Sequence, residues 1–212
     1  MLVKICGCTE AEHLLAAAEA GADLVGIVFV PGVRRRVPVE KARGMVHALR
    51  RQWAPQGPQV VGLFADQPLE EVRQTAWQVG LDRVQLCGRE GPDYWARLGL
   101  PILKALHVEE DLAGLEASLL QVAKAGHLAL LDRAAPGQPG GTGLSLDWGL
   151  AARLAQKGHQ FLLAGGQTPE NVGEAVRLVH PRGGDVSSGV ETAGVMDIAT
   201  IRAVVRAARS AA

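Results

Sequence analysis

The sequence is poor in cysteine and in aromatic residues. It has three cysteines, Cys6, Cys8 and Cys87, and aromatic side chains make up 4% of its 212 residues. An odd and sparse set of cysteines argues against a disulfide scaffold. The Cys6-Gly7-Cys8 triplet has no second ligand pair at a spacing that a zinc site needs. We therefore expect neither a disulfide framework nor a structural metal.

The chain also lacks a charge of one sign and a long apolar run. Its 22 basic and 22 acidic side chains cancel, so nothing indicates a nucleic-acid or anionic-membrane surface. No uncharged apolar run reaches the length of about 18 residues that a membrane span needs. The first residues do not have the pattern of a signal peptide. We expect a cytoplasmic protein whose partner is a small molecule, with no nucleic acid and no membrane involved.

What the sequence does have is an alternation of short apolar runs with longer helical stretches. The runs are near-continuous rather than alternating in polarity, which is typical of parallel strands buried on both faces. They predict strands at residues 2–6, 23–30, 59–64, 83–86, 101–105, 127–131, 160–163 and 185–187. Helices are predicted at 10–20, which opens with a capping-box pattern at 9–12, and at 39–51, 69–79, 92–98, 109–125, 147–156, from Thr168 onward and at 197–208.

Eight strand–helix units of roughly 25 residues each describe a (β/α)8 barrel at the small end of its size range. The alternative is an open doubly wound sheet. No Gly-x-Gly-x-x-Gly fingerprint follows the first strand, which counts against a dinucleotide-binding version of that sheet. No internal linker divides the chain, so we predict an α/β protein with a single TIM-barrel domain over residues 1–212.

In such barrels the reactive groups project from the carboxyl ends of the strands. The set at the predicted ends contains one potential base, one potential acid, several cations and two small-residue turns. Its members are Cys6, Phe29 with Arg34-Arg35-Arg36, Phe64, Gln85, Lys104, Asp132, Gly165-Gly166 and Ser187-Ser188-Gly189.

Three small-residue loops predict a phosphate site. Gly165-Gly166 precedes the helix predicted at Thr168, and Ser187-Ser188-Gly189 is rich in backbone N–H and hydroxyl donors. Loops seven and eight of these barrels commonly hold a phosphate, because backbone donors and a helix N-terminus favour an anion. The Gly140-Gly141-Thr142-Gly143 loop can close over the same group. The alternative is that these glycines only make tight turns.

Asp132 follows the apolar run 128–131, where burial can raise its pKa and keep a proton on it. A carboxylic acid held in that way can act as a general acid. Arg133 would have the opposite effect if its side chain pointed inward. The alternative is a surface ion pair or a turn cap.

Cys6 can act as a base only with help, because an unperturbed thiol has a pKa near 8.5. Lys4, two residues earlier in the strand, points to the same side and can supply a cation. The alternative is a buried, inert thiol. One arginine of the run 34–36 can form a fork with a substrate carboxylate, or the run can be a solvated loop.

The ordered set of motifs resembles the phosphoribosylanthranilate isomerase family of tryptophan biosynthesis, and the resemblance covers essentially the whole chain. The motifs are Val3-Lys4-Ile5-Cys6-Gly7, Val25-Gly26-Ile27-Val28-Phe29 with Pro31 and Arg35, Val84-Gln85-Leu86, Leu131-Asp132, Gly140-Gly141-Thr142-Gly143, Ala164-Gly165-Gly166 and Asp185-Val186-Ser187-Ser188-Gly189-Val190-Glu191.

The resemblance implies an Amadori rearrangement of N-(5-phosphoribosyl)anthranilate, with Asp132 as general acid and Cys6 as general base. It places Arg35 at the anthranilate carboxylate and Asp185 near the ribose hydroxyls, with Lys4 and Gln85 among the substrate-binding residues. The phosphate is assigned to Gly140, Gly141, Thr142, Gly165, Gly166, Ser187, Ser188 and Gly189. No metal or organic cofactor is implied, since acid, base and orientation suffice.

Two positions depart from the family pattern. Cys87 stands where the family usually has histidine, and Val195-Met196-Asp197 stands where a lysine commonly precedes the aspartate. Neither position carries the expected chemistry, so these departures bear on rim contacts or affinity. The oligomeric state stays open between monomer and homodimer.

Three other functions compete with this interpretation. A histidine-pathway isomerase is expected to use two carboxylates, and Cys6 stands where one would be. A ribulose-phosphate epimerase needs metal-binding histidines at strand ends, whereas His127 begins its predicted strand. A catalytically silent barrel would bind a phosphate ligand or partner without turnover.

Overall fold

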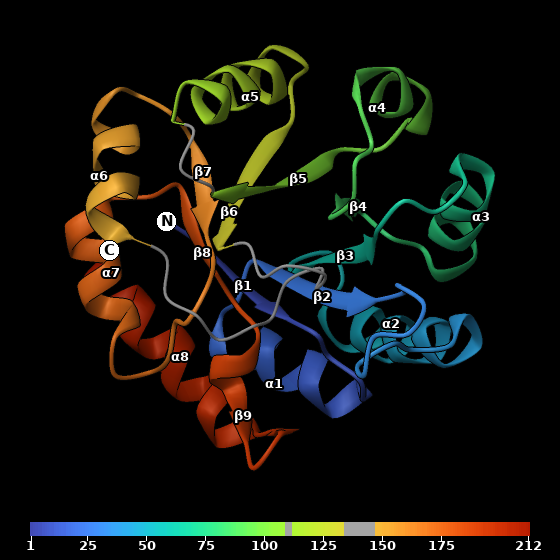
Figure 1. The fold of residues 1–212 in the computed structure, drawn as a ribbon. Helices are drawn as coiled ribbons and strands as arrows, with labels where there is room; N and C mark the ends of the chain where they lie inside the picture. The colour runs from blue at the N-terminus through green and yellow to red at the C-terminus, as the bar shows by residue number, and fades with distance from the viewer. Residues whose placement is uncertain (109–111, 134–146) are drawn as a thin grey trace.

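The computed structural model describes residues 1–108, 112–133 and 147–212, and in them a closed parallel barrel forms the centre of the molecule (Figure 1). Strand β1 pairs with β2 on one side and with β8 on the other, and Lys4 lies opposite Asp185 across the β1–β8 seam. This closure excludes the open sheet. The strands are β1 Leu2–Cys6, β2 Leu24–Val28, β3 Gln59–Phe64, β4 Arg83–Leu86, β5 Ile102–Val108, β6 Leu128–Arg133, β7 Phe161–Leu163 and β8 Gly183–Val186.

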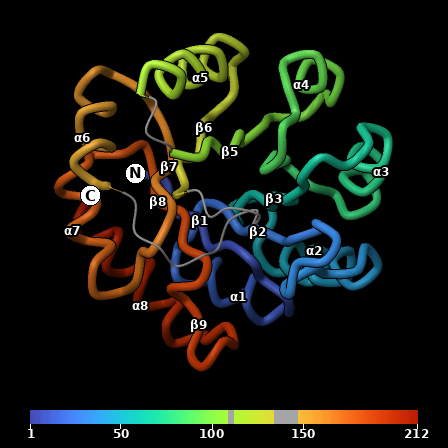
Figure 2. Tube along the Cα trace, viewed as in Figure 1, coloured from blue at the N-terminus to red at the C-terminus, as the bar shows by residue number. Residues whose placement is uncertain are grey.

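Helices follow the strands and form an outer ring in chain order (Figure 2). Consecutive helices pack against each other from α1 to α4 and from α6 to α8, and α8 in turn contacts α1. The helices are α1 Ala11–Ala20, α2 Val39–Trp53, α3 Leu69–Val79, α4 Pro92–Leu98, α5 Leu112–Lys124, α6 Trp148–Gln156, α7 Val172–Val179 and α8 Ile198–Ala211. The predicted (β/α)8 barrel is therefore confirmed.

Two helix starts differ from the sequence prediction. Helix α1 is capped one residue later than expected: Glu10 is its N-cap, and His13 Nδ1 accepts the backbone N–H of Glu10 at 3.3 Å. Helix α7 begins at Val172 rather than near Thr168. Asn171 Oδ1 accepts a hydrogen bond from the Thr168 backbone N–H at 2.8 Å. Residues 168–171 therefore form a turn that the asparagine side chain closes. That turn delays the helix.

The core has two layers, one between sheet and helices and one inside the barrel. Alternate strand residues serve the two layers, since successive side chains of a strand point to opposite faces. The outer layer includes Val25, Ile27 and Phe161. The inner layer is smaller and includes Leu24, Val61, Leu103, Leu130 and Leu162, all buried.

One charged pair lies in the interior of the barrel. Lys4 is 0% exposed, and its Nζ donates to Asp185 Oδ1 at 2.9 Å. Burial lowers the pKa of Lys4, but the Asp185 carboxylate, together with the Cys6 side chain, outweighs burial, and the net direction is upward. Lys4 is therefore held as a cation below the site.

We expect Lys4→Met to lower the free energy of unfolding by about 3–5 kcal/mol, because it leaves the Asp185 carboxylate buried without its partner. The measurement is urea unfolding followed by circular dichroism. Lys41→Met is the control: it removes the exposed Lys41–Glu10 pair and should cost about 0–1 kcal/mol. Equal losses of unfolding free energy in the two variants would show that the buried pair contributes no more to stability than the exposed pair.

Beyond β8 the chain forms a 3-10 turn at Ser188–Val190 and a short hairpin before α8. The hairpin consists of β9 Glu191–Thr192 and β10 Val195–Met196, which pair antiparallel. Among the residues the structure describes, no helix has the length and apolar character to cross a membrane.

Candidate active site

A cavity opens at the carboxyl ends of the barrel strands. It contains about 830 Å³ of space that no atom occupies, including its mouth toward solvent, which is in the range of small-molecule sites. Every strand of the barrel except β7 contributes to its wall, and Ala164 lines it directly after β7. The lining residues are Cys6, Val28, Val30, Val33, Arg35, Leu63, Gln85, Cys87, Ala105, His107, Leu130, Asp132, Ala164–Gln167, Asp185, Ser187 and Ser188.

Most residues predicted from the sequence come together in this cavity, and a few lie elsewhere. Nine of them line the wall: Cys6, Arg35, Gln85, Asp132, Gly165, Gly166, Asp185, Ser187 and Ser188. Lys4 is not in the wall and instead lies deeper, paired with Asp185. Gly189 is not a lining residue and packs against the backbone of Gln167, which is one. Gly140, Gly141 and Thr142 lie outside the described residues.

Cys6 is the last residue of β1, and it is buried with a free thiol. Burial raises the pKa of Cys6 above its ordinary value of 9.0. The positive charges of Lys4 and Arg35 lower it, and the Asp185 carboxylate raises it, but burial dominates. The predicted help from Lys4 is therefore present. It reduces the cost of forming a thiolate without making the thiolate the main form at neutral pH.

Asp132 lies near the end of β6, one residue before Arg133. Burial raises its pKa above 3.8, and the Asp185 carboxylate raises it further. The backbone N–H of Arg133 donates to Asp132 Oδ1 at 2.8 Å and lowers the pKa, but does not reverse the direction. Asp132 therefore has the environment of a carboxyl that can hold and deliver a proton.

Arg35 is the arginine of the run 34–36 that enters the cavity wall. Its guanidinium lies over the turn at Gly7, where φ is +84° and an added Cβ would come within 2.6 Å of Arg35 Nη1. Glycine at position 7 therefore serves two needs, the left-handed backbone and the close approach of the guanidinium. This contact places a cation beside the Cys6 end of the cavity.

Gln85 and Cys87 form a polar contact on the β4 side. Gln85 Nε2 donates to Cys87 Sγ at 3.3 Å, and burial raises the pKa of Cys87 to about 12. The thiol at position 87 is thus a neutral wall group. Gln85 Oε1 is buried and has no hydrogen-bond partner among the described residues, so it can accept a donor from a bound molecule.

The loops after β7 and β8 form the small-residue side of the cavity. Gly165 and Gly166 have φ values of +90° and +68°, a conformation that glycine adopts without strain. Ser187 Oγ donates to the Cys6 carbonyl at 3.4 Å, which ties the β8 loop to the end of β1. Glycine and serine at these positions leave room for an anion next to backbone and hydroxyl donors.

We expect Gly189→Ala to lower stability by several kcal/mol and to weaken anion binding. A Cβ at position 189 would lie 1.7 Å from the Gln167 carbonyl oxygen, so the two loops must separate. Gly44→Ala is the control, since nothing lies near its added Cβ in the exposed face of α2; it should stabilise by about 0.5–1 kcal/mol. Thermal melting and phosphate binding are measured for both variants. An unchanged melting point in Gly189→Ala would contradict the packing argument.

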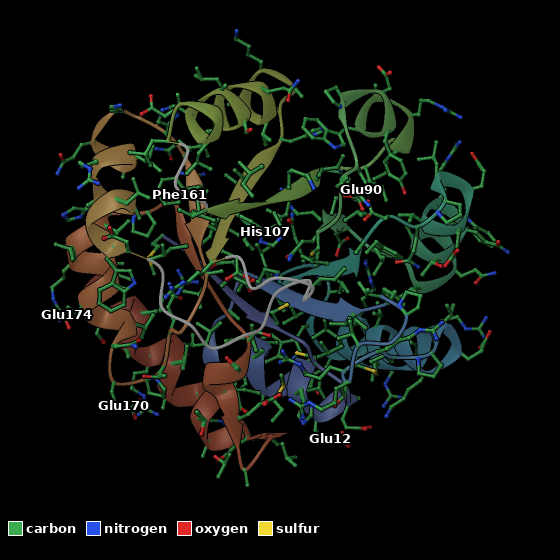
Figure 3. All side chains as sticks on the ribbon, in the orientation of Figure 1. Glu12, Glu90, His107, Phe161, Glu170 and Glu174 are labelled. Carbon is green, nitrogen blue, oxygen red and sulfur yellow. The ribbon has the colours of Figure 1, made fainter. Side chains whose placement is uncertain are left out.

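The sequence prediction ended the fifth strand too early, so it placed Lys104 at the strand end and missed His107. Strand β5 runs to Val108, and Lys104 is not at its end. Lys104 Nζ donates to the Leu86 carbonyl and to Glu90 Oε2, each at 3.2 Å, outside the cavity. His107 takes the place in the wall, opposite Asp132 in the β5–β6 register. Figure 3 shows His107 toward the middle of the barrel and Glu90 beside α4.

Other wall residues were also missed from the sequence. Phe64 ends β3 and Phe29 directly follows β2, as expected, but their rings stack at 5.2 Å in the outer core and do not line the cavity. The apolar wall instead comes from smaller residues, Val28, Val30, Val33, Leu63, Ala105, Leu130 and Ala164. Only the alternation of faces along each strand could have identified them.

The closed parallel barrel, with polar groups gathered at the carboxyl ends of its strands, defines a (β/α)8-barrel enzyme for a small molecule. Comparison with known proteins narrows the class. The family model described as N-(5'phosphoribosyl)anthranilate (PRA) isomerase matches residues 3–207. The chain belongs to this family.

Individual relatives agree with that assignment. The N-(5'-phosphoribosyl)anthranilate isomerase of Roseiflexus castenholzii is 42% identical over 214 residues, covering 100% of both chains. The phosphoribosyl anthranilate isomerase structure from Thermus thermophilus matches with 36% identity and a TM-score of 0.83, over 99% of both chains. A further isomerase structure, in complex with reduced 1-(o-carboxyphenylamino)-1-deoxyribulose 5-phosphate, matches with 32% identity and a TM-score of 0.82, over 99% of this chain and 100% of that one.

Proposed function

We propose that this protein catalyses the Amadori rearrangement of N-(5-phosphoribosyl)anthranilate to 1-(2-carboxyphenylamino)-1-deoxyribulose 5-phosphate in tryptophan biosynthesis. The observation that carries the proposal is the meeting of Cys6 and Asp132, from β1 and β6, in the wall of one cavity. Membership of the isomerase family supports the choice of reaction. The two residues supply the base and the acid that the rearrangement needs.

The reaction begins with proton transfer from Asp132 to the furanose ring oxygen. The C1–O bond breaks, and the nitrogen lone pair forms an iminium ion with C1. The Cys6 thiolate then removes the proton from C2, and the electron pair of that bond forms the enolamine. Proton gain at C1 and proton loss from the C2 hydroxyl give the ketone. The sequence of steps is an isomerisation that consumes no external oxidant or reductant.

The two ends of the cavity support the same orientation of substrate. Arg35 and the valines of the β2 end can receive the anthranilate carboxylate and ring. The Gly165-Gly166 and Ser187-Ser188 loops can receive the phosphate. Asp185 lies in the wall on β8, which pairs with the strand that carries Cys6, and can receive ribose hydroxyls; Gln85 Oε1 offers a further acceptor. A ligand anchored at both ends would present its C1 and C2 atoms to the acid and the base.

The direct test of this function is turnover of freshly prepared phosphoribosylanthranilate, followed by loss of its fluorescence. The purified protein should convert the substrate with no metal or organic cofactor added. Failure to convert it, with the protein folded and the phosphate site able to bind inorganic phosphate, would favour a silent phosphate-binding barrel instead.

We expect kcat/KM to follow a bell-shaped pH profile. The active form has Asp132 protonated and Cys6 ionised. Between the two pKa values, most of the enzyme instead has Asp132 ionised and Cys6 protonated. The two forms carry the same number of protons, so their ratio does not change with pH in this range. Activity therefore falls on the acid side with the pKa of Asp132, above 3.8, and on the alkaline side with the pKa of Cys6, above 9.0. Measurement of kcat/KM from pH 4 to 10 checks this, and an alkaline fall that begins below pH 9.0 would contradict the assignment of Cys6.

A further inference from the structure

An ion-pair cluster joins the loop after β2 to the hairpin after β8. Arg34 Nη2 donates to Glu191 Oε1 at 2.7 Å and to Oε2 at 2.8 Å, and Arg34 Nη1 donates to the Gly194 carbonyl. A single nitrogen, Arg34 Nη2, thus contacts both carboxylate oxygens in charge-assisted hydrogen bonds. Glu191 is 10% exposed in its side chain, so solvent screens this carboxylate less than it screens a fully exposed one.

Arg35 pairs with the same carboxylate but makes no hydrogen bond to it. Its Nη1 is 3.4 Å from Glu191 Oε1, close enough for an ion pair and without the geometry of a hydrogen bond. Among the residues that the structure describes, this buried nitrogen has no hydrogen-bond partner. The Arg35 guanidinium lies in the cavity wall. The Glu191 carboxylate balances the charge of Arg35, but this buried N–H has no hydrogen-bond acceptor in the described part of the chain, which is costly for a donor on a charged group.

Two arginines thus face one carboxylate, and Arg34 holds both of its oxygens. If Arg34 were absent, Glu191 could accept hydrogen bonds from Arg35 and turn its guanidinium away from the cavity. With Arg34 present, the donors of Arg35 stay available for an anion in the site. Arg34 is 63% exposed and does not line the cavity, so its effect on a ligand must act through Glu191 and Arg35.

We propose that Arg34 is a positioning residue: by occupying Glu191, it keeps Arg35 available for the carboxylate of the substrate. This inference rests on the proposed function, because that function supplies a substrate with an aromatic carboxylate. Arg34 thus contributes to recognition of the anthranilate end of the substrate without contacting the substrate itself.

The test compares two ligands that differ only in the carboxylate. They are reduced 1-(2-carboxyphenylamino)-1-deoxyribulose 5-phosphate and its phenylamino counterpart, and calorimetry gives the two dissociation constants. Their ratio measures how much the carboxylate contributes, whatever happens to phosphate binding. The proteins are the wild type, Arg34→Gln, the double variant Arg34→Gln/Glu191→Gln, and Arg36→Gln. The last is the control, since Arg36 is an exposed arginine of the same loop and the charge change is identical.

We expect the wild type to bind the carboxylated ligand at least about tenfold more tightly than its counterpart, as charge-assisted contacts require. In Arg34→Gln the ratio should fall to within about twofold of one. In the double variant the ratio should recover to at least the wild-type value, because no carboxylate then competes for Arg35. Arg36→Gln should match the wild type. Thermal melting of each variant confirms that it is folded.

Three outcomes would overturn the inference. The ratio can stay unchanged in Arg34→Gln, or it can fall equally in Arg36→Gln. It can also stay low in the double variant, which would mean that Arg34 acts only by tethering the hairpin. Each is distinct from failure of the proposed function, which the wild type alone would show by not converting phosphoribosylanthranilate.

Discussion

Replacing Cys6 by serine is expected to lower kcat by about 10²–10⁴-fold, the range that a positioned general base contributes. Serine keeps the size and position of the side chain at the end of β1, but its hydroxyl is a far weaker acid than a thiol. Almost none of it is therefore ionised near neutral pH. Steady-state kinetics with phosphoribosylanthranilate gives the loss in kcat.

Binding of a substrate analogue separates this effect from damage to the site. Reduced 1-(2-carboxyphenylamino)-1-deoxyribulose 5-phosphate should bind Cys6→Ser within a few-fold of the wild type, since the thiol holds neither end of the ligand in the proposed orientation. Cys8→Ser is a matched control, because Cys8 is also a buried free thiol but does not line the cavity. Wild-type turnover in Cys6→Ser would remove the thiol from the mechanism.

Replacing Asp132 by asparagine should lower kcat by a similar factor, about 10²–10⁴-fold, because the amide cannot donate a proton to the ring oxygen in the same way. The amide oxygen can still accept the Arg133 backbone N–H that Asp132 Oδ1 accepts at 2.8 Å. The local backbone should therefore stay in place. A variant with unchanged kcat would show that the acid is another group.

The same substitution should stabilise the folded protein at neutral pH. The folded state raises the pKa of Asp132, mainly through burial, so ionisation of this carboxyl costs free energy in the folded state. That cost is fully present above the folded-state pKa and disappears below the unfolded-state value near 3.8. Asp132→Asn should therefore melt higher than the wild type at pH 7–8 and not at pH 3. Melting curves at both pH values test whether the substitution stabilises the protein. A melting point of Asp132→Asn below that of the wild type at pH 7–8 would contradict the prediction.

Much of the barrel could be predicted from local patterns, because each strand is a continuous apolar run and each helix has its own start and stop signals. The end of β5 could not be predicted in this way, because the strand continues through Leu106-His107-Val108 and the polar His107 faces the cavity. The sequence also could not show that the Lys104 side chain points away from the cavity. That orientation depends on the Leu86 and Gly88 carbonyls and on Glu90, which β4 and its loop bring near.

The candidate site shows the same division between local and tertiary information. Cys6 and Asp132 could be placed because Cys6 ends an apolar strand and Asp132 directly follows the apolar run 128–131. The run 34–36 could not reveal which arginine enters the cavity, since that depends on the turn at Gly7 and on Glu191, more than 150 residues away in the chain. Contacts of this kind exist only after the barrel has closed and joined the β2 and β8 loops.

The most direct measurement for the two assigned roles is the isotope effect of substrate carrying deuterium at C2 of the ribose. If Cys6 removes the C2 proton, that step becomes fully rate-limiting in Cys6→Ser, and this variant should show a clear primary isotope effect on kcat. If Asp132 opens the ring, ring opening limits Asp132→Asn, and the effect should disappear there. The reverse pattern, or the same isotope effect in both variants, would contradict the account.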